Sequence, residues 1–143
     1  MVDSLTPEER SIRMGRIRGR DTKPEMIVRR LVYKLGYRYR LHRKDLPGKP
    51  DIVLGKLRKV IFIHGCFWHR HSDPNCRLAR LPKTRLEFWG PKLAANAERD
   101  ARHEEALKQL GWDVMVVWEC ELWNSEQVEN KLRQFLEGRH ESD

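Results

Sequence analysis

Residues 51–64 read DIVLGKLRKVIFIH, and this stretch decides the fold. It holds two apolar runs, Asp51-Ile52-Val53-Leu54 and Val60-Ile61-Phe62-Ile63, which are separated by a turn at Gly55-Lys56. Short runs rich in β-branched residues and bounded by turn residues are typical of strands. Since the second run is apolar on both faces, we expect it to lie in the middle of a sheet. A catalytic site often lies where such a strand ends, and His64 stands at that point.

Helices and further strands are expected on both sides of these runs. Apolar residues at helical spacing follow a capping box at Thr22-Lys23-Pro24-Glu25. In chain order, the expected elements are a helix from Thr22 to Gly36, a strand at 37–41, the two strands above, a helix from Pro91 to Gly111, a strand at 112–118, and a helix capped by Ser125 and ended by Gly138. This order predicts an α/β protein in which a mixed β-sheet is flanked by helices.

Length and composition indicate one globular domain. The chain has 143 residues, of which 39% are hydrophobic and 35% are charged, and domains commonly have roughly 100–150 residues. No apolar run approaches the ~20 residues of a membrane span, and the first residues lack the basic region and apolar core of a signal peptide. We therefore expect a cytoplasmic protein without a membrane partner.

The net charge of +8 is concentrated in the first third of the chain. Residues 1–50 carry 14 Lys and Arg against 6 Asp and Glu, whereas residues 51–143 carry 15 of each. A cluster of arginines near the N-terminus is of the kind that binds a phosphate backbone, and it consists of Arg10, Arg13, Arg16, Arg18 and Arg20. A solvated terminus and a membrane-surface arm are the alternatives. We expect a flexible basic DNA-binding arm at residues 1–20, followed by a single domain at residues 21–143.

The three cysteines, too few for a disulfide framework, indicate a metal site. Cys66, His71 and Cys76 are separated by four residues each, and Cys120 follows the last expected strand. Three thiolates and one imidazole make the Cys₃His set that closes a tetrahedral structural zinc site. Asp73 could take the place of Cys76, although a thiolate is the softer ligand, and Cys120 could instead be an ordinary buried residue. With four protein ligands, such a metal would stabilise the loop and would not activate water.

Acidic and histidine residues near the strand ends could form a second site, for hydrolysis. Asp51 begins the first strand, and a carboxylate at that point can hold hydrated magnesium. His64 or His69, as a neutral imidazole, could accept a proton from water that attacks a phosphate. Asp100 falls on the inward stripe of the long helix, where an acid needs a partner such as a histidine. For Glu25, a purely structural role in the capping box and a catalytic role are about equally supported.

Phe67 and Trp68 are adjacent large aromatic residues in the same loop. In an enzyme that acts on nucleic acid, such a pair can wedge between base steps, at a cost of a few kcal/mol for unstacking. The alternative is that one ring packs on the loop and only the other is exposed.

Five stretches closely resemble the very short patch repair (Vsr) endonucleases, and the resemblance as a whole spans the chain from about Arg13 to Leu122. These stretches are Leu46–Asp51, Val60–His69, Thr84–Trp89, Asn96–Asp100 and Val117–Cys120. The resemblance implies a restriction-endonuclease-like core with a structural zinc, and a single endonuclease domain at residues 21–143. It also implies magnesium-dependent nicking of one DNA strand next to a T:G mismatch, which arises when 5-methylcytosine deaminates to thymine.

The same resemblance implies roles for individual residues. In the active site, magnesium would be bound by Asp51 and the backbone carbonyl of Ile63, the general base would be His69, and the supporting residues would be Asp100, His64 and Glu25. Three parts of the chain would bind DNA. The basic arm would bind it through Arg13, Met14 and Arg16, with Met14 in the minor groove. A wedge of Phe67 and Trp68 would enter the major groove, and Lys92 and Asn96 would lie near the mismatched bases.

The expected partner is double-stranded DNA that contains a T:G mismatch. By the same resemblance, a cytosine-5 methyltransferase and a repair polymerase with ligase would be functional companions. We expect a monomer in the bacterial cytoplasm, associated with the nucleoid when it acts. Two alternatives stay open: a restriction- or homing-type endonuclease that cuts paired DNA, and a non-catalytic, zinc-stabilised DNA-binding module.

Overall fold

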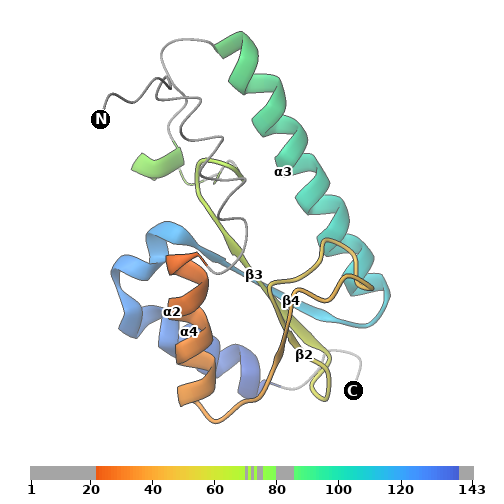
Figure 1. Cartoon of the computed structure of the whole chain (residues 1–143), viewed down its shortest axis with the longest axis vertical. Helices are drawn as coiled ribbons and strands as arrows, with labels where there is room; N and C mark the ends of the chain where they lie inside the picture. Colours follow the sequence, from red (N-terminus) through yellow and green to blue (C-terminus); the bar gives the residue numbers. More distant parts are fainter. Residues whose placement is uncertain (1–21, 70, 72, 74–75, 80–85, 139–143) are drawn as a thin grey trace, which may run out of the picture.

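The computed structural model describes residues 22–69, 71, 73, 76–79 and 86–138 (Figure 1). The basic arm expected at residues 1–20, with Arg13, Met14 and Arg16, lies outside the described residues. In chain order, the elements are α2 (Lys23–Lys34), β1 (Arg40–Leu41), β2 (Ile52–Leu54), β3 (Lys59–His64), η1 (Arg77–Ala79), α3 (Leu86–Gln109), β4 (Asp113–Trp118), η2 (Glu119–Trp123) and α4 (Ser125–Glu137). The predicted order of helices and strands is confirmed, with two short 3₁₀ helices added.

The four strands form one mixed sheet in the order β1-β2-β3-β4. Strand β2 pairs antiparallel with β1 and β3, and β3 pairs parallel with β4 from Lys59↔Asp113 to His64↔Trp118. The central position predicted for the Val60–Ile63 run is confirmed, because β3 has a partner on each side and is buried along almost its whole length. The parallel pair brings the C-terminal ends of β3 and β4 to the same end of the sheet.

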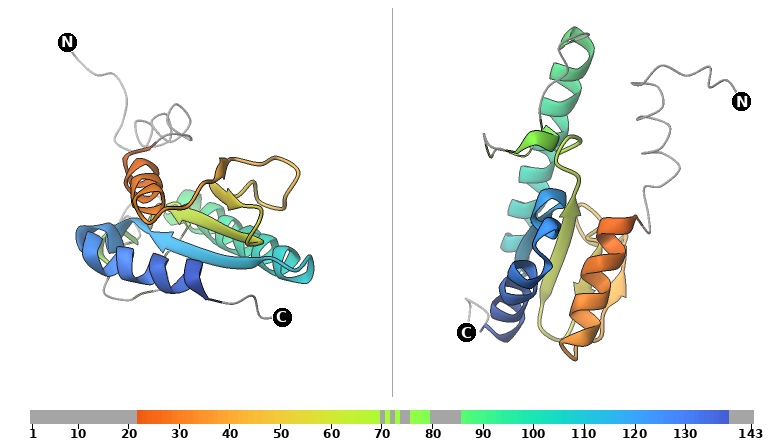
Figure 2. Two further views of the ribbon diagram at one scale, coloured as in Figure 1. Left: turned by 90° about the horizontal axis from the view of Figure 1, so that it is seen from below. Right: turned by 90° about the vertical axis from the view of Figure 1, so that its left-hand side faces the viewer.

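Helices cover both faces of the sheet, and alternate strand residues point to each face. One face packs against α2 and α4 through Ile52, Leu54, Ile61 and Val117. The opposite face, with Val53, Val60 and Phe62, packs against Leu107 of α3 and against Trp112. Figure 2 shows α2 on one side of β3 and α3 on the other. The predicted α/β fold with a helix-flanked mixed sheet is therefore confirmed.

The helix boundaries follow from local sequence signals. Thr22 caps α2 by accepting a hydrogen bond from the Glu25 N–H (3.4 Å), and Gly36, with φ +96°, ends it in the left-handed region. Ser125 was wrongly expected to cap the last helix. Asn124 is the cap, because its side-chain oxygen accepts from the Gln127 N–H (3.1 Å).

Two other expectations about element boundaries were wrong. The strand expected at 37–41 forms only at Arg40–Leu41, because residues 37–39 do not pair with β2. Pro91 was expected to open the long helix, but α3 begins five residues earlier, at Leu86. A proline in the second turn removes one backbone hydrogen bond near the start of the helix, and the ladder beyond it is unaffected.

Two consecutive basic side chains, one from the turn before β3 and one from its first residue, hold the ends of helices. The Arg58 guanidinium donates to the Leu110 carbonyl (2.9 Å) just after α3. The buried Lys59 ammonium donates to the carbonyls of Phe135 and Gly138 at the end of α4. Positive charge at a helix C-terminus is favourable because the last carbonyls have no partner inside the helix. These contacts fix α3 and α4 against the sheet.

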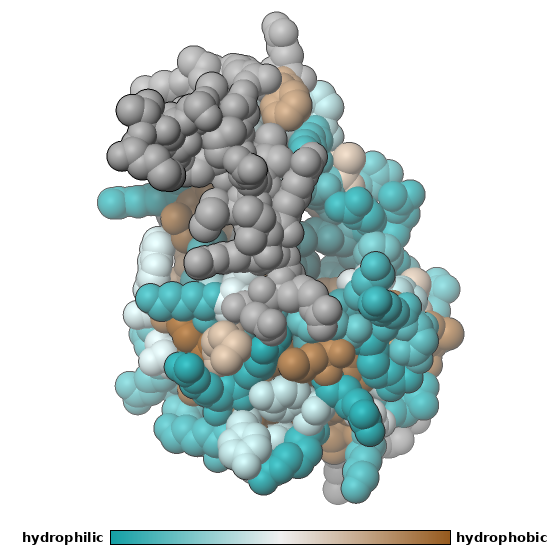
Figure 3. Space-filling view, viewed as in Figure 1, coloured by the Kyte–Doolittle hydropathy of each residue, from teal (hydrophilic) through white to brown (hydrophobic). Residues whose placement is uncertain are grey.

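The surface of the described part is mostly polar. Figure 3 shows hydrophilic side chains over most of the coloured surface in that view, with scattered apolar residues between them. Among the described helices, none is long and apolar enough to cross a membrane.

Candidate active site

A cluster of four sulfur and nitrogen ligands lies at the C-terminal ends of β3 and β4. One ligand atom from each of Cys66, His71, Cys76 and Cys120 lies within 4.8 Å of the others. Cys66 comes two residues after β3, and Cys120 comes two residues after β4. Because these strands are parallel neighbours, cysteines that are 54 positions apart meet, and the Cys120 N–H donates to Cys66 Sγ at 3.4 Å. We call these four residues the Cys₃His cluster.

The Cys₃His cluster is largely shielded from water. Cys66 and Cys76 are buried, and the His71 ring stacks on Trp118 with 4.2 Å between ring centroids. Burial raises the pKa of the Cys66 thiol, and it also raises the pKa of Cys120. Asp73, the alternative ligand, is exposed and is not among the four clustered residues. The geometry therefore favours Cys76 over Asp73 as the fourth member.

A second group, beside the first, joins the end of β3 to α3. His69 Nδ1 lies 2.6 Å from Asp100 Oδ2, and the His69 and His64 rings stack in parallel with centroids 3.9 Å apart. With Nδ1–H donated to Asp100, the other ring nitrogen of His69, Nε2, is left with its lone pair. The expectation that Asp100 lies inward beside a histidine is confirmed.

The charges in this group are set by burial and by the neighbouring ring. Burial, together with the nearby His69, lowers the pKa of His64 to about 4, so His64 is neutral at pH 7. For Asp100, burial opposes ionisation, but the hydrogen bond and charge of His69 outweigh it and lower the pKa of that carboxyl. The pair therefore combines an ionised carboxylate with an oriented imidazole.

Asp51 directly precedes the adjacent strand β2, and its side chain faces the end of β3. Its Oδ2 accepts a hydrogen bond from the Ile63 N–H at 2.8 Å. Burial raises the pKa of Asp51 to about 7, and the negative charge of Glu25 adds to this effect, while the Ile63 N–H, His69 and Arg29 oppose it. Ile63 directly precedes His64, whose ring stacks on His69, so Asp51 lies at the same end of β3 as the His69–Asp100 pair.

Glu25 reaches the same site from the first turn of α2. It is buried, and Arg29 Nη2 donates to its Oε2 at 2.9 Å. This contact explains why α2 tolerates a buried carboxylate, because the guanidinium one turn along the helix supplies the opposite charge. The Glu25 backbone N–H thus takes part in the Thr22 cap, while its carboxylate lies at the site and accepts from Arg29.

Sequence reasoning missed His42, which lies between Glu25 and Asp51. Its Nε2 is 3.5 Å from Glu25 Oε2, and its Nδ1 is 3.7 Å from Asp51 Oδ1. Arg29 Nη2 lies 3.2 Å from His42 Nε2, so this nitrogen accepts a hydrogen bond and the ring proton is on Nδ1, facing Asp51. The register Leu41↔Ile52 continues with the His42 N–H donating to the Asp51 carbonyl (3.3 Å). Pairing of the two strands was the signal that could have revealed His42.

The expected aromatic wedge belongs to a cluster of rings against α3. Phe67 and Trp68 are half-buried, and both meet the buried Trp89 ring edge-on, with centroids 5.3 and 5.8 Å away. Asn96 donates to the Trp68 carbonyl at 3.1 Å, and the Lys92 ammonium lies 5.5 Å from the centre of the Phe88 ring. The structure therefore brings Lys92 and Asn96 to the same surface as the wedge.

Comparison with known proteins identifies the family. The family model described as "DNA mismatch endonuclease Vsr" matches residues 2–76. The chain is 52% identical over 137 residues to "Type II nicking enzyme V.XorIIP" of Xanthomonas oryzae pv. oryzae, covering 96% of this chain and 98% of that protein. The chain belongs to the Vsr family. It is also 43% identical to "DNA mismatch endonuclease Vsr" of Escherichia coli, over 90% of this chain and 80% of the relative.

Solved structures support the fold of this Vsr-family chain. The catalytic domain of homing endonuclease I-Bth0305I superimposes with a TM-score of 0.55 and covers 80% of this chain and 94% of that domain. At 18% sequence identity, this likeness concerns the fold alone. The expected endonuclease-like core is therefore supported, and family membership identifies the protein as a DNA endonuclease related to nicking enzymes.

Proposed function

We propose that this protein nicks one strand of duplex DNA next to a T:G mismatch by magnesium-dependent hydrolysis of a phosphodiester bond. The observation that carries the proposal is that Asp51 and the His69–Asp100 pair lie at the same end of β3, Asp51 bonded to Ile63 and His69 stacked on the next residue, His64. An oxygen ligand for a hard cation and an oriented imidazole base are the two groups that such hydrolysis requires. Membership of the Vsr family supports the choice of a T:G mismatch as substrate.

The donor set around Asp51 fits magnesium, which prefers oxygen ligands and keeps several waters. Asp51 is a buried carboxylate with a raised pKa, so a cation beside it would stabilise its ionised form. In a strand, the N–H and C=O of one residue point to the same side, and the Ile63 N–H points to Asp51. Asp51 and the Ile63 carbonyl are the proposed ligands. When bound, magnesium would neutralise charge on the phosphate and lower the pKa of bound water.

His69 is the proposed general base. Asp100 holds its Nδ1–H, so Nε2 is free to take a proton from the attacking water. The neutral, buried His64 stacks on His69 and fixes the plane of its ring. Glu25 is assigned a supporting role, because Arg29 and His42 already occupy its surroundings.

The Cys₃His cluster is proposed to bind a structural zinc. Three thiols and an imidazole within 4.8 Å are the donor set that zinc prefers. Such an ion would tie the loop after β3 to the end of β4. The loop carries Phe67, Trp68 and His69, so zinc would order both the wedge and the base.

DNA binding is proposed to involve the wedge, Lys92 and Asn96, together with the basic arm. A mismatched step costs less to unstack than a paired one, which suits a wedge of two aromatic rings. A cytosine-5 methyltransferase and a repair polymerase with ligase are the proposed companions, with a monomer acting at the nucleoid in the bacterial cytoplasm.

Two end-labelled duplexes that differ only by T:G in place of C:G test the proposal. With magnesium, we expect a nick confined to the T strand of the mismatched duplex, and loss of that nick in Asp51→Ala. Equal cutting of both duplexes would instead identify a nuclease that acts on paired DNA. Binding without cutting, in several methylation-site contexts, would identify a non-catalytic DNA-binding module.

A further inference from the structure

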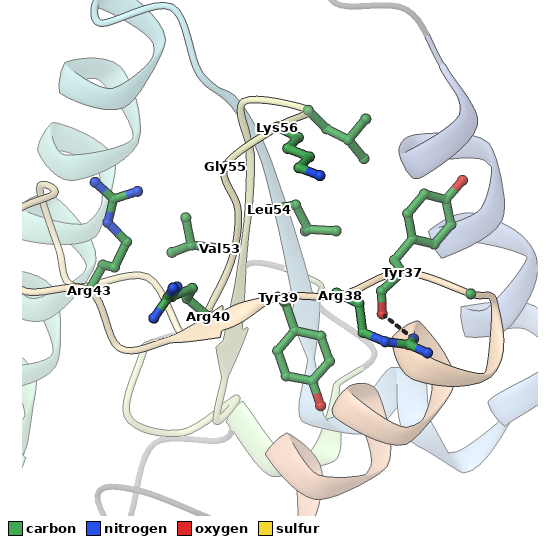
Figure 4. Close-up of a pocket in the computed structure, with 11 residues that line it drawn as sticks. Tyr37, Arg38, Tyr39, Arg40, Arg43, Val53, Leu54, Gly55 and Lys56 are labelled. Carbon is green, nitrogen blue, oxygen red and sulfur yellow. Dashed lines mark hydrogen bonds between the residues drawn. The ribbon is translucent and has the colours of Figure 1, made fainter.

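A groove of about 880 Å³ opens where the chain that precedes β1 lies apart from the sheet. Residues 37–39 do not pair with β2, although their alternating sequence predicts a longer strand. Figure 4 shows Tyr37, Arg38 and Tyr39 on the extended chain, separated from the side chains of Leu54 and Lys56 on the hairpin. We call this feature the β1–β2 groove. The gap exists because the edge strand begins only at Arg40.

The rim of the β1–β2 groove is strongly basic. Its lining includes Arg38, Arg40, Arg43 and Lys56, and no Asp or Glu is among the described residues that line it. Arg43 is paired with Asp45 outside the groove, through bonds of 2.9 and 2.6 Å. Arg40 and Lys56 are exposed. Cations gathered in this way repel one another, and a polyanion that binds among them relieves the repulsion.

The floor and walls of the groove suit a sugar-phosphate chain better than base edges. Val53, Leu54 and Leu57 supply apolar surface, and Tyr37 and Tyr39 add aromatic surface. A guanidinium such as that of Arg40 binds a phosphate through two parallel N–H groups, and an ammonium such as that of Lys56 binds it as a point charge. Contacts of this kind position a duplex without reading its sequence.

Strand β2 connects the proposed active site to the β1–β2 groove, because Asp51 directly precedes this strand and the groove is lined by its last residues and the turn that follows. Val53 and Leu54 are two and three residues beyond Asp51, which corresponds to roughly 7–10 Å along a strand. A duplex placed with one phosphate at Asp51 extends beyond the site in both directions. The groove is thus within reach of phosphates a few nucleotides from the nicked bond.

We propose that the β1–β2 groove binds the phosphodiester backbone of the substrate duplex, on one side of the nicked bond. The inference rests on the proposed function for the identity of the DNA, but the charge and shape of the groove are independent of it. The groove contributes affinity that is independent of sequence and strongly dependent on salt. It has no part in the chemical step.

The test compares Arg40→Gln/Lys56→Gln with a matched control, Arg133→Gln/Lys131→Gln, which removes the same charge from α4. All four side chains are exposed, so both variants should fold. Dissociation constants are measured for T:G and C:G duplexes across a range of salt concentrations. We expect the groove variant to bind both duplexes about 10-fold more weakly at ~0.1 M salt, with a slope of log K against log salt that is smaller by about 2. The control variant should match the parent.

Nicking and duplex length separate this proposal from the proposed function. At saturating DNA, the nicking rate of the groove variant should equal that of the parent, because only binding changes. A duplex shortened on the side of the mismatch that lies toward the groove no longer reaches it. The parent and the groove variant should therefore bind this duplex with equal affinity. The proposed role of the groove would be contradicted if the groove variant kept the salt slope of the parent, or if the control variant lost as much affinity for DNA. The two proposals can also be separated if the parent does not nick T:G duplexes. If the groove variant still loses salt-dependent DNA binding in that case, the groove proposal is supported and the proposed mismatch activity is contradicted.

Discussion

The Cys₃His cluster and the Asp51–His69 site lie side by side at one end of the sheet, yet they are built differently. In the Cys₃His cluster, four ligand atoms converge within 4.8 Å, and the thiols have few other partners to orient them. In the Asp51–His69 site, protein hydrogen bonds already hold each group: the Ile63 N–H holds Asp51, and Asp100 holds His69. The proposed zinc would order the first arrangement, whereas the second is preorganised by hydrogen bonds within the protein.

Removal of zinc should have the largest effect, and it should act on stability. A zinc-selective chelator, added with excess magnesium, is expected to lower the thermal midpoint by more than about 10 °C, because binding of structural zinc contributes on the order of 10 kcal/mol in small zinc-dependent domains. Cys76→Ser should do the same without chelator. Calorimetry and metal analysis measure both effects. A full complement of metal in Cys76→Ser would place the fourth ligand elsewhere.

Asp51→Asn should lower the rate of nicking and leave stability unchanged, whereas removal of zinc acts on stability. We expect nicking to fall by on the order of 10³-fold, since a direct magnesium ligand is lost. The thermal midpoint should not fall, because burial raises the pKa of Asp51 to about 7 and makes the ionised carboxylate unfavourable without a cation. Glu126→Gln, which neutralises an exposed acid of α4, is the control. A large loss of stability in Asp51→Asn would mean that the carboxylate is structural.

His69 and Asp100 should act as one unit. His69→Ala is expected to reduce the single-turnover rate by about 10²–10³-fold, the usual contribution of a positioned general base. Asp100→Ala should cost less, and the double variant should be no slower than His69→Ala, because Asp100 acts through the imidazole it orients. Additive losses in this cycle would show that Asp100 has a separate role.

His42→Ala should have the smallest effect on nicking, and it tests whether His42 belongs to the active site. His42 Nδ1 faces Asp51 at 3.7 Å, so we expect the magnesium concentration for half-maximal nicking to rise about 10-fold, in line with the loss of a group that orients a metal ligand. The rate at saturating magnesium should return to within a few-fold of the parent. Lys44→Ala, an exposed neighbour, serves as control. A rate that magnesium does not restore would assign His42 to the chemical step.

Local sequence patterns were sufficient to predict the order of the helices and strands and most members of the two clusters. Capping at Thr22, the apolar run of β3 and the inward stripe that contains Asp100 are local patterns, because they depend on residues within a few turns or on the period of a strand. The set of three cysteines and His71 was also evident from residue type and spacing.

Only the tertiary structure decided which distant residues meet. Cys120 reaches Cys66 because β4 lies parallel to β3, and His42 reaches Asp51 because β1 and β2 pair in one particular register. The alternation of Tyr37–Leu41 predicts a full strand, but the chain joins the sheet only at Arg40, and the unpaired residues before it open the β1–β2 groove. Local patterns specify the faces of helices and strands, whereas strand order, direction and register are set by the global packing of these faces.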